Sequence, residues 1–305
     1  MEYPIDELHT PADFIRWSAS RFNEAQLYFG HGTDNAIDEA VWLVMHTLHL
    51  PNNVPAFLWE SRLTYAEKQA LFTIIEKRIG QRIPAAYLTG IAWFAGLQFK
   101  VNPHVLIPRS PIAELILKHY EPWVNPEKIY RVLDLCTGSG CIAIATALLA
   151  FPDAEVDAVD ISPEALAIAQ ANIDGYDIQD RVYTVQSDLF SSLKGIRYNL
   201  IVSNPPYVDR DELATMPAEY HHEPRLGLEA GADGLLFAKR ILREALDYLT
   251  PDGVLIVEVG VSQYALMEAY PSVPFMWLAF EAGEDGVFLL TAEQLHEYAN
   301  IFAQG

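Results

Sequence analysis

The sequence predicts an α/β protein in which a doubly wound, mostly parallel sheet follows a smaller helical domain. Short apolar runs typical of buried strands alternate with helical patterns between residues 131 and 260. Residues 8–83 differ, because their apolar side chains recur at helical spacing. The 305 residues are 51% apolar and 20% charged, which suits a sizeable core and one ordinary domain plus a small one.

Three helices are expected in the N-terminal part. The first begins after the N-cap Thr10, where a proline occupies the first helical position. The second follows Asp34, and the third begins at Thr64, whose spacing from Glu67 is that of a capping box. We therefore expect residues 1–90 to form a helical domain.

The amino-acid composition and the apolar spacing change at the end of this domain. Residues 91–108 carry aromatic and β-branched side chains with turn signals, a pattern that predicts a β-hairpin linker. A further helix is expected after Ser110-Pro111. Residues 109–305 are then expected to form the larger domain.

The larger domain is expected to alternate strands with helices. The strands are predicted at residues 131–136, 154–160, 181–188, 198–204 and 253–260. The helices are predicted at residues 141–150, 164–173 and 235–249. The last two apolar segments, FMWLAFEAG and GVFLLTA, are expected to form an antiparallel hairpin at the sheet edge.

Composition argues against several classes of protein. No apolar run is long enough to cross a bilayer, and the acidic N-terminus lacks the basic and apolar regions of a signal peptide. A cytoplasmic location is therefore expected. Cys136 and Cys141 stand five apart without CxxC spacing or paired histidines, so we expect free thiols and no metal site.

The net charge bears on the partner. The chain carries 20 basic and 41 acidic residues, which gives a formal charge of −21 at pH 7. Phosphate contacts need clustered Lys and Arg, so direct binding to duplex nucleic acid is not expected. A basic protein would be attracted to such a surface, although acidic enzymes can owe their charge to solubility alone.

The first motif that points to a ligand is DLCTGSG, residues 134–140. It follows a predicted strand and opens a predicted helix, and Gly138 and Gly140 let the backbone turn tightly and approach a ligand. Taken alone, Gly138-x-Gly140-x-x-Ala143 also fits a dinucleotide fingerprint. A dinucleotide-dependent oxidoreductase therefore stays open at this point.

Three aspartates at successive strand ends favour a different cofactor. Asp134 stands four residues before the first glycine, where a carboxylate repels a pyrophosphate and suits an ammonium group. Asp160 ends the next strand, where it can accept hydrogen bonds from both ribose hydroxyls, and Asp188 ends the third, where it can accept from an adenine amino group. Together they predict S-adenosylmethionine as cofactor and S-adenosylhomocysteine as product; ordinary helix capping is the alternative for each aspartate.

The residues expected to contact this cofactor come from the strand ends and the loops that follow them. They are Asp134, Cys136, Thr137, Gly138, Ser139, Gly140, Asp160, Ile161, Asp188, Leu189 and Asn204. Leu189 and its neighbour Phe190 are expected to flank the adenine ring.

The most specific motif is Asn204-Pro205-Pro206-Tyr207, directly after an apolar strand. Two prolines make a rigid, extended loop whose carbonyl groups face whatever enters. The Asn204 side-chain oxygen and the Pro205 carbonyl can both accept hydrogen bonds from one NH₂ group, and Tyr207 offers a flat face to a planar substrate. We expect all four residues to be catalytic, with Asn204, Pro205 and Tyr207 contacting the substrate.

This chemistry suits an amide nitrogen, which is conjugated and a poor nucleophile. Hydrogen bonds accepted from its protons stabilise the positive charge that builds up as the C–N bond forms. Methyl transfer is an in-line displacement, so positioning can supply ~7–11 kcal/mol of the barrier in well-oriented reactions. Neither a metal ion nor a covalent nucleophile is needed.

The order and spacing of DLCTGSG and NPPY resemble class I methyltransferases that act on planar nitrogens, over residues 105–291. Within that group, LIPRS (106–110), HEPRLGLEAGADGL (222–235) and EVG (258–260) resemble the protein-(glutamine-N5) methyltransferases. The resemblance implies a Rossmann-like, mostly parallel seven-stranded sheet with a terminal antiparallel hairpin. It also implies methyl transfer from S-adenosylmethionine to the side-chain amide nitrogen of a glutamine in a protein.

Two branches of this family differ in their substrate. One methylates the glutamine of the GGQ motif in peptide release factors, and the other a glutamine of large-subunit ribosomal protein L-three. The release-factor branch usually reads LIPRP, whereas this chain reads LIPRS and resembles the ribosomal-protein branch. The resemblance makes that basic protein the expected substrate and residues 1–90 the expected recognition domain.

The roles of Arg109 and Glu223 stay open, although both are expected substrate-binding residues. Arg109 can orient the substrate loop or brace the region of the methionine carboxylate, and a structural ion pair is its alternative. Glu223 can contact the substrate or fix the loop after NPPY. His221 and His222 lie in the same loop, which we expect to be solvated.

Nucleic-acid amino-methyltransferases remain an alternative, because an exocyclic amine is also a planar NH₂ group. Such enzymes must flip a base and grip phosphates, and this chain has no basic run. The oxidoreductase alternative leaves NPPY unexplained, and a pure binding module would leave both motifs unexplained. A protein-glutamine methyltransferase is therefore the predicted function.

Overall fold

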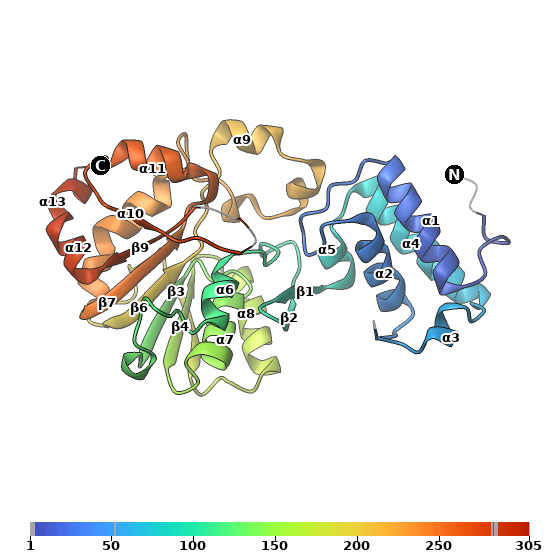
Figure 1. The fold of residues 1–305 in the computed structure, drawn as a ribbon, viewed down its shortest axis with the longest axis horizontal. Helices are drawn as coiled ribbons and strands as arrows, with labels where there is room; N and C mark the ends of the chain where they lie inside the picture. Colours follow the sequence, from blue (N-terminus) through green and yellow to red (C-terminus); the bar gives the residue numbers. More distant parts are fainter. Residues whose placement is uncertain (1–3, 52, 282, 284–285, 305) are drawn as a thin grey trace. The chain divides into compact units, whose positions relative to one another are not determined.

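A computed structural model describes residues 4–51, 53–281, 283 and 286–304. The chain divides into two compact units, each drawn in Figure 1. One unit comprises residues 1–92 together with 217–222, and the other comprises residues 93–216 together with 223–305. No helix among the described residues is long and apolar enough to span a membrane.

The first unit is helical, as the apolar spacing predicts. Its helices are α1 (Pro11–Glu24), α2 (Ala36–Thr47), α3 (Ala56–Trp59), α4 (Tyr65–Gln81) and α5 (Ala85–Thr89). Capping boxes at Thr10 and Thr64 begin α1 and α4, so the predicted starts of both helices are confirmed. Asn35 caps α2, one residue later than the predicted start. Phe14, Phe22 and other apolar residues of α1, α2 and α4 form the core of this unit.

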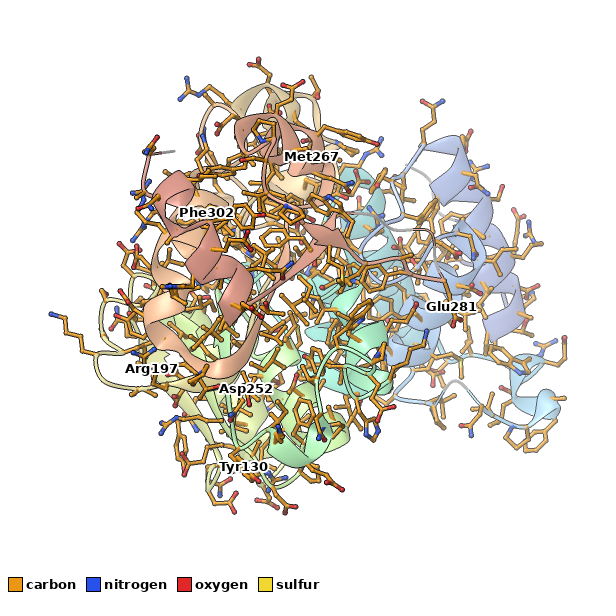
Figure 2. All side chains as sticks on the ribbon, turned by 60° about the vertical axis from the view of Figure 1, so that its left-hand side comes forward. Tyr130, Arg197, Asp252, Met267, Glu281 and Phe302 are labelled. Carbon is orange, nitrogen blue, oxygen red and sulfur yellow. The ribbon has the colours of Figure 1, made fainter. Side chains whose placement is uncertain are left out.

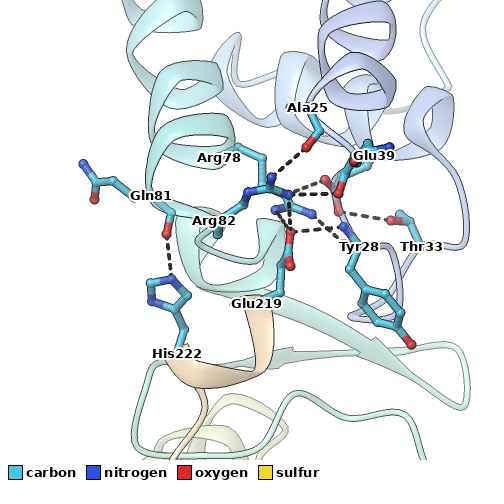
Figure 3. Close-up of polar contacts among 10 residues, drawn as sticks. Ala25, Tyr28, Thr33, Glu39, Arg78, Gln81, Arg82, Glu219 and His222 are labelled. Carbon is cyan, nitrogen blue, oxygen red and sulfur yellow. Dashed lines mark hydrogen bonds and ion pairs between the residues drawn. The ribbon is translucent and has the colours of Figure 1, made fainter. Parts of the chain in front are cut away.

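A short segment from the distant part of the sequence completes the helical unit. Glu219 is buried, and its carboxylate accepts a hydrogen bond from Arg78 Nη1 at 3.0 Å. The same carboxylate accepts from the backbone N–H of Tyr28 at 3.1 Å, while Glu39 accepts from Arg78 Nε at 2.7 Å. Figure 3 shows Arg78 between the two carboxylates. The segment 217–222 is therefore built into the unit by charge-assisted hydrogen bonds.

His222 belongs to the same segment. Its Nε2 lies 2.8 Å from the carbonyl oxygen of Gln81 at the end of α4 (Figure 3). His221 is exposed, as expected for a solvated loop, whereas His222 is half-buried. His222 is thus partly solvent-accessible and also bonded to α4, a contact that the sequence did not indicate.

The second unit contains a seven-stranded sheet with the order β5-β4-β3-β6-β7-β9-β8. The strands are β3 (Arg131–Leu135), β4 (Glu155–Asp160), β5 (Val182–Gln186), β6 (Tyr198–Ser203), β7 (Leu249–Glu258), β8 (Met276–Trp277) and β9 (Val287–Thr291). Strands β3 to β7 are parallel, while β9 pairs antiparallel with β7 and with β8. The predicted sheet and its terminal hairpin are confirmed, although residues 282, 284 and 285 of the hairpin lie outside the described residues.

Helices cover both faces of this sheet (Figure 1). One face packs on α6 (Ile112–Leu117), α7 (Cys141–Ala145) and α8 (Pro163–Gly175). The other packs on α10 (Leu236–Glu244), α11 (Gln263–Ala269), α12 (Ala292–Glu297) and α13 (Ala299–Phe302). Phe302 of α13, labelled in Figure 2, is buried in this second core. Because strand residues alternate between faces, Leu200 and Val202 of β6 join the first core and Ile201 the second.

Some elements differ from their predicted bounds. The helix predicted at 141–150 is α7 followed by a π-helical turn at Thr146–Ala150, and the helix predicted at 235–249 is α10 followed by a 3₁₀ turn at Ala245–Tyr248. Within residues 91–108, where the sequence predicts a β-hairpin linker, β1 (Ile91–Phe94) and β2 (Leu97–Lys100) form a two-stranded sheet, and residues 101–108 contain no strand. A short helix, α9 (Arg210–Thr215), lies in the loop after NPPY.

The strand order decides where a ligand can bind. From β3 the chain moves outward to β5 and then returns to β6 on the other side of β3. Leu135 and Ser203, the last residues of β3 and β6, are register partners. The loops that begin at Cys136 and Asn204 therefore start side by side at the switch point of the sheet, where open α/β sheets bind their ligands.

Candidate active site

A cavity of about 470 Å³ lies at the carboxyl ends of the parallel strands. Most of the predicted cofactor residues line it: Cys136, Thr137, Gly138, Ser139, Asp160, Ile161, Asp188, Leu189 and Asn204. Asp134 and Gly140 are not among its lining residues. The three strand ends identified in the sequence thus meet around one space.

Asp134 lies beneath the loop that it precedes. Its Oδ2 accepts hydrogen bonds from Thr137 Oγ1 at 2.5 Å and from the backbone N–H of Ala143 at 3.0 Å. Burial raises the pKa of Asp134 to about 7. Its Oδ1 has no hydrogen-bond partner among the described residues. The Asp134 carboxylate thus fixes the shape of the loop. A cationic group bound beside the loop would offset the free energy that it costs to bury Oδ1 without a hydrogen bond.

Gly140 shows why this loop needs a small residue. Its φ is +80°, and an added Cβ would stand 3.2 Å from Ala169 Cβ and 3.3 Å from Ile144 Cδ1. A side chain would therefore be strained by its backbone and would press on α7 and α8. Gly140 serves the close packing of the loop rather than contact with the cavity.

Asp160 presents its carboxylate where the loop and β4 meet. Its Oδ2 accepts from the backbone N–H of Gly138 at 2.9 Å, and its Oδ1 accepts from Ser162 N at 3.0 Å. Burial raises the pKa of this carboxyl, which the two backbone donors partly offset. Each oxygen keeps a second acceptor site, so the carboxylate can hold a pair of ligand hydroxyls.

Asp188 has a partner that the sequence did not reveal. Arg240 Nη1 on α10 lies 2.8 Å from Asp188 Oδ1, and both residues line the cavity. No local signal marks Arg240, because the face that α10 turns toward the cavity depends on helix packing. The contact of Asp188 with an adenine amino group stays a prediction. Arg240 binds Asp188 Oδ1, so Oδ2 is the oxygen that would accept from the adenine.

The residues after Asp188 divide between cavity and core. Leu189 lines the cavity, as expected. Phe190 does not line it, and its ring stacks on Tyr248 with centroids 4.7 Å apart. The expectation that Phe190 flanks a ligand ring is therefore wrong, because the side chain points into the core beneath α10.

The NPPY loop follows β6 beside the cofactor loop. Asn204 and Pro206 line the cavity, whereas Pro205 and Tyr207 are not among its lining residues. Ser203 Oγ donates to the carbonyl of Leu135 at 2.8 Å, which joins the ends of β6 and β3. The loop therefore starts from a fixed point directly next to DLCTGSG.

Arg109 and Glu223 form a bidentate ion pair with N–O distances of 2.7 and 2.8 Å. Glu223 is buried and also accepts from the backbone N–H of Ile107 at 3.0 Å. This is the structural ion pair left open for Arg109, and it joins the LIPRS segment to the loop after NPPY. Arg109 lines the cavity and Glu223 does not, and a contact of either residue with substrate stays a prediction.

The cavity wall also includes the LIPRS segment and both cysteines. The LIPRS segment lines the cavity together with the two residues before it, His104 and Val105, which belong to no predicted site. Cys136 and Cys141 are free thiols, as predicted. Burial raises the pKa of both, so neither thiol is a thiolate near neutral pH.

Two relatives match nearly the whole chain. One, from Francisella tularensis subsp. tularensis, is 50% identical over 299 residues, 98% of this chain and 95% of its own length. The other, from Xanthomonas campestris pv. campestris, is 51% identical over 290 residues, 95% of this chain and 94% of its own length. Both are named ribosomal protein uL3 glutamine methyltransferase. The chain belongs to this family.

Two further comparisons concern the methyltransferase domain and its fold. Residues 113–219 match the model of the methyltransferase small domain. The catalytic domain of hMettl16, solved with a MAT2A 3'UTR hairpin, is 16% identical with a TM-score of 0.50, over 74% of this chain and 81% of that one. This second likeness shows the class I methyltransferase fold alone.

Family and fold identify a methyltransferase and imply S-adenosylmethionine as the methyl donor. The dinucleotide-dependent oxidoreductase is thereby excluded. The residues present fit that donor: Asp160 offers acceptors for two hydroxyls, and the buried Asp134 Oδ1 suits a nearby cation. Asp188 at the third strand end supplies a further acceptor.

Proposed function

We propose that this protein transfers a methyl group from S-adenosylmethionine to the side-chain amide nitrogen of a glutamine in ribosomal protein uL3. One observation carries the proposal: Asn204 and Pro206 line the same cavity as Gly138, Asp160 and Asp188. The motif suited to a planar NH₂ group therefore shares one space with the motif suited to the methyl donor. The name of both relatives supports uL3 as the substrate.

On the cofactor side, each of three carboxylates binds or balances a different group of S-adenosylmethionine in this proposal. Asp160 accepts from the ribose hydroxyls and Asp188 from the adenine amino group, while Asp134 balances the ammonium from beneath the loop. The bound cofactor supplies a methyl group that is electrophilic because it is carried on a sulfonium. Apolar side chains such as Ile107, Leu189 and Phe237 line the rest of the cavity and exclude water.

On the substrate side, Asn204 and Pro205 hold the amide nitrogen. The Asn204 side-chain oxygen and the Pro205 carbonyl accept hydrogen bonds from its two protons and turn its lone pair toward the methyl group. As the C–N bond forms, the nitrogen becomes positive and these hydrogen bonds strengthen, which lowers the barrier. The proton is lost to water afterward, so no strong base is required.

The proposed partner fits the charge of the chain. A net charge of −21 attracts a basic ribosomal protein and disfavours a phosphate backbone. The helical unit is the proposed recognition domain for that protein. A ribosomal substrate also agrees with the cytoplasmic location expected from the sequence.

Intact-mass spectrometry tests the substrate. Unmethylated uL3 and an unmethylated peptide release factor are each incubated with the protein and S-adenosylmethionine. We expect a mass gain of one CH₂ group on uL3 and none on the release factor. A gain on the release factor alone would keep the chemistry and overturn the substrate, and a gain on neither would overturn both.

Asn204→Ala tests the chemistry. Because Asn204 supplies an acceptor that matters most in the transition state, we expect kcat to fall by at least ~10²-fold. Calorimetry should give a Kd for S-adenosylmethionine close to that of the wild type. Asn23→Ala, at an exposed position of α1, is the matched control and should leave both quantities unchanged. A variant Asn204→Ala with full turnover would exclude this role.

A further inference from the structure

Tyr207 is held from three directions. Its hydroxyl donates a hydrogen bond to Glu258 Oε1 at 3.1 Å, and its carbonyl accepts one from Ser262 Oγ at 2.8 Å. Its ring lies against the backbone of Gly260, where an added Cβ would stand 2.6 Å from ring carbon Cε2. Neighbouring groups therefore set the ring plane of Tyr207, and a substituted residue 260 would push the ring aside.

Glu258 makes a second contact at the end of β7. The residue is 4% exposed, and its Oε2 accepts a hydrogen bond from Ser110 Oγ at 2.5 Å. A buried carboxylate is costly unless hydrogen bonds satisfy it. The hydroxyls of Ser110 and Tyr207, one on each oxygen, therefore hold the carboxylate in one orientation.

Ser110 is oriented in turn by the start of α6. Its Oγ accepts a hydrogen bond from the backbone N–H of Ile112 at 3.2 Å, which leaves its own O–H to donate to Glu258. Ser110 and its neighbour Arg109 line the cavity. One carboxylate thus links the LIPRS wall of the cavity to the NPPY loop, and it gives the EVG motif a role.

We propose that Glu258 and Ser110 are positioning residues that fix the plane of the Tyr207 ring against the planar amide of the substrate. The inference rests on the proposed function and on the prediction from the sequence that the Tyr207 ring faces that amide. Both residues act through Tyr207 and touch no reacting atom. Since a displacement of about 1 Å can cost on the order of 10²-fold in rate, breaking the link lowers kcat more than it weakens substrate binding.

A double-mutant cycle tests the link. Ser110→Ala removes one donor to Glu258 and should lower kcat about tenfold, with KM for uL3 and Kd for S-adenosylmethionine changed less than about twofold. Ser110→Thr restores a hydroxyl and should recover kcat. In a Tyr207→Phe background the Ser110→Ala change should cost less than about twofold, because the link is already broken.

Tyr120→Phe is the matched control for the loss of a buried hydroxyl. The Tyr120 hydroxyl lies 2.8 Å from Thr146 Oγ1 in the same unit, and Tyr120 does not line the cavity. We expect this variant to keep the wild-type kcat. Additive losses of kcat in the cycle, or an equal loss in Tyr120→Phe, would show a general structural effect and overturn the positioning role.

A spectroscopic measurement separates this inference from the proposed function. In protein labelled with 3-fluorotyrosine, the ¹⁹F resonance of Tyr207 is the one that Tyr207→Phe removes. Ser110→Ala should shift or broaden that resonance and leave the Tyr120 resonance in place; an unchanged Tyr207 resonance would overturn the positioning role. Because this experiment needs no substrate, failure to methylate uL3 counts against the proposed function alone.

Discussion

Asp134 illustrates what a single residue contributes to this site. The sequence marks it as a carboxylate inside a strand, four residues before Gly138. The structure adds that it is fully buried and holds Thr137 and Ala143. Because burial raises its pKa to about 7, its charge near neutral pH depends on what binds beside the loop.

The pH dependence of stability follows from this shift. In the folded protein the pKa is raised above its ordinary value of 3.8 to about 7, so the contribution of Asp134 to stability is full below pH ~4 and is lost as pH rises through ~7. From pH ~5.5 to ~8 the wild type should lose about 2 kcal/mol of unfolding free energy relative to Asp134→Asn. Urea unfolding across this range measures the difference.

Two controls accompany that measurement. Asp153→Asn removes the charge of an exposed residue, and its curve should run parallel to that of the wild type. Saturating S-adenosylhomocysteine, whose ammonium would lower the pKa of Asp134, should reduce the pH dependence of the wild type. Parallel curves for wild type and Asp134→Asn would contradict the buried-carboxylate account, and an unchanged slope with ligand would contradict the ammonium assignment.

At the scale of elements, the segment 217–222 is the least expected feature. It follows α9 in the chain, yet its packing belongs to the helical unit, where Glu219 shares Arg78 with Glu39. Arg82 adds a second cation 3.5 Å from Glu219. A buried ion pair broken on one side leaves an uncompensated charge, so this contact matters to the fold of the unit.

Glu219→Ala should therefore destabilise the helical unit by about 3 kcal/mol, since Arg78 loses one of its two buried carboxylates. Urea unfolding monitored by circular dichroism measures the loss. Glu76→Ala, at an exposed position of the same helix as Arg78, should change the unfolding free energy by less than about 0.5 kcal/mol. Equal effects of the two substitutions would mean that the buried network contributes nothing.

For the whole molecule, charge is the dominant property. A net charge of −21 on 305 residues produces a field that acts at long range on a basic partner and is screened by salt. The charge influences how often the partners meet, whereas the cavity decides what happens to the bound glutamine. The two effects therefore separate in a kinetic experiment.

We expect KM for uL3 to rise steeply between ~0.05 and ~0.5 M NaCl while kcat stays nearly constant, because screening weakens association and leaves the buried site unaffected. Steady-state methylation at saturating S-adenosylmethionine measures both constants. Calorimetric titration of the cofactor at the same salt concentrations is the control. A KM independent of salt would show that the acidic surface plays no part in recognition.

The sequence by itself determined the order of the parallel strands and of the longer helices, together with the functional residues at the strand ends. These depend on short-range patterns: apolar periodicity, the caps at Thr10 and Thr64, and the glycines and prolines of DLCTGSG and NPPY. Because parallel strands end at one edge of a sheet, strand order along the chain was enough to expect Asp160, Asp188 and Asn204 around one space.

Only the tertiary structure decided which partner each side chain has. Arg240 beside Asp188, Glu258 between Ser110 and Tyr207, and Glu219 beside Arg78 all join residues more than fifty positions apart or on separate elements. Such pairs depend on helix faces and loop paths that no local pattern specifies. The partners of the buried carboxylates Glu258 and Glu219, and of the exposed Asp188 at the cavity wall, therefore became visible only when the chain was folded.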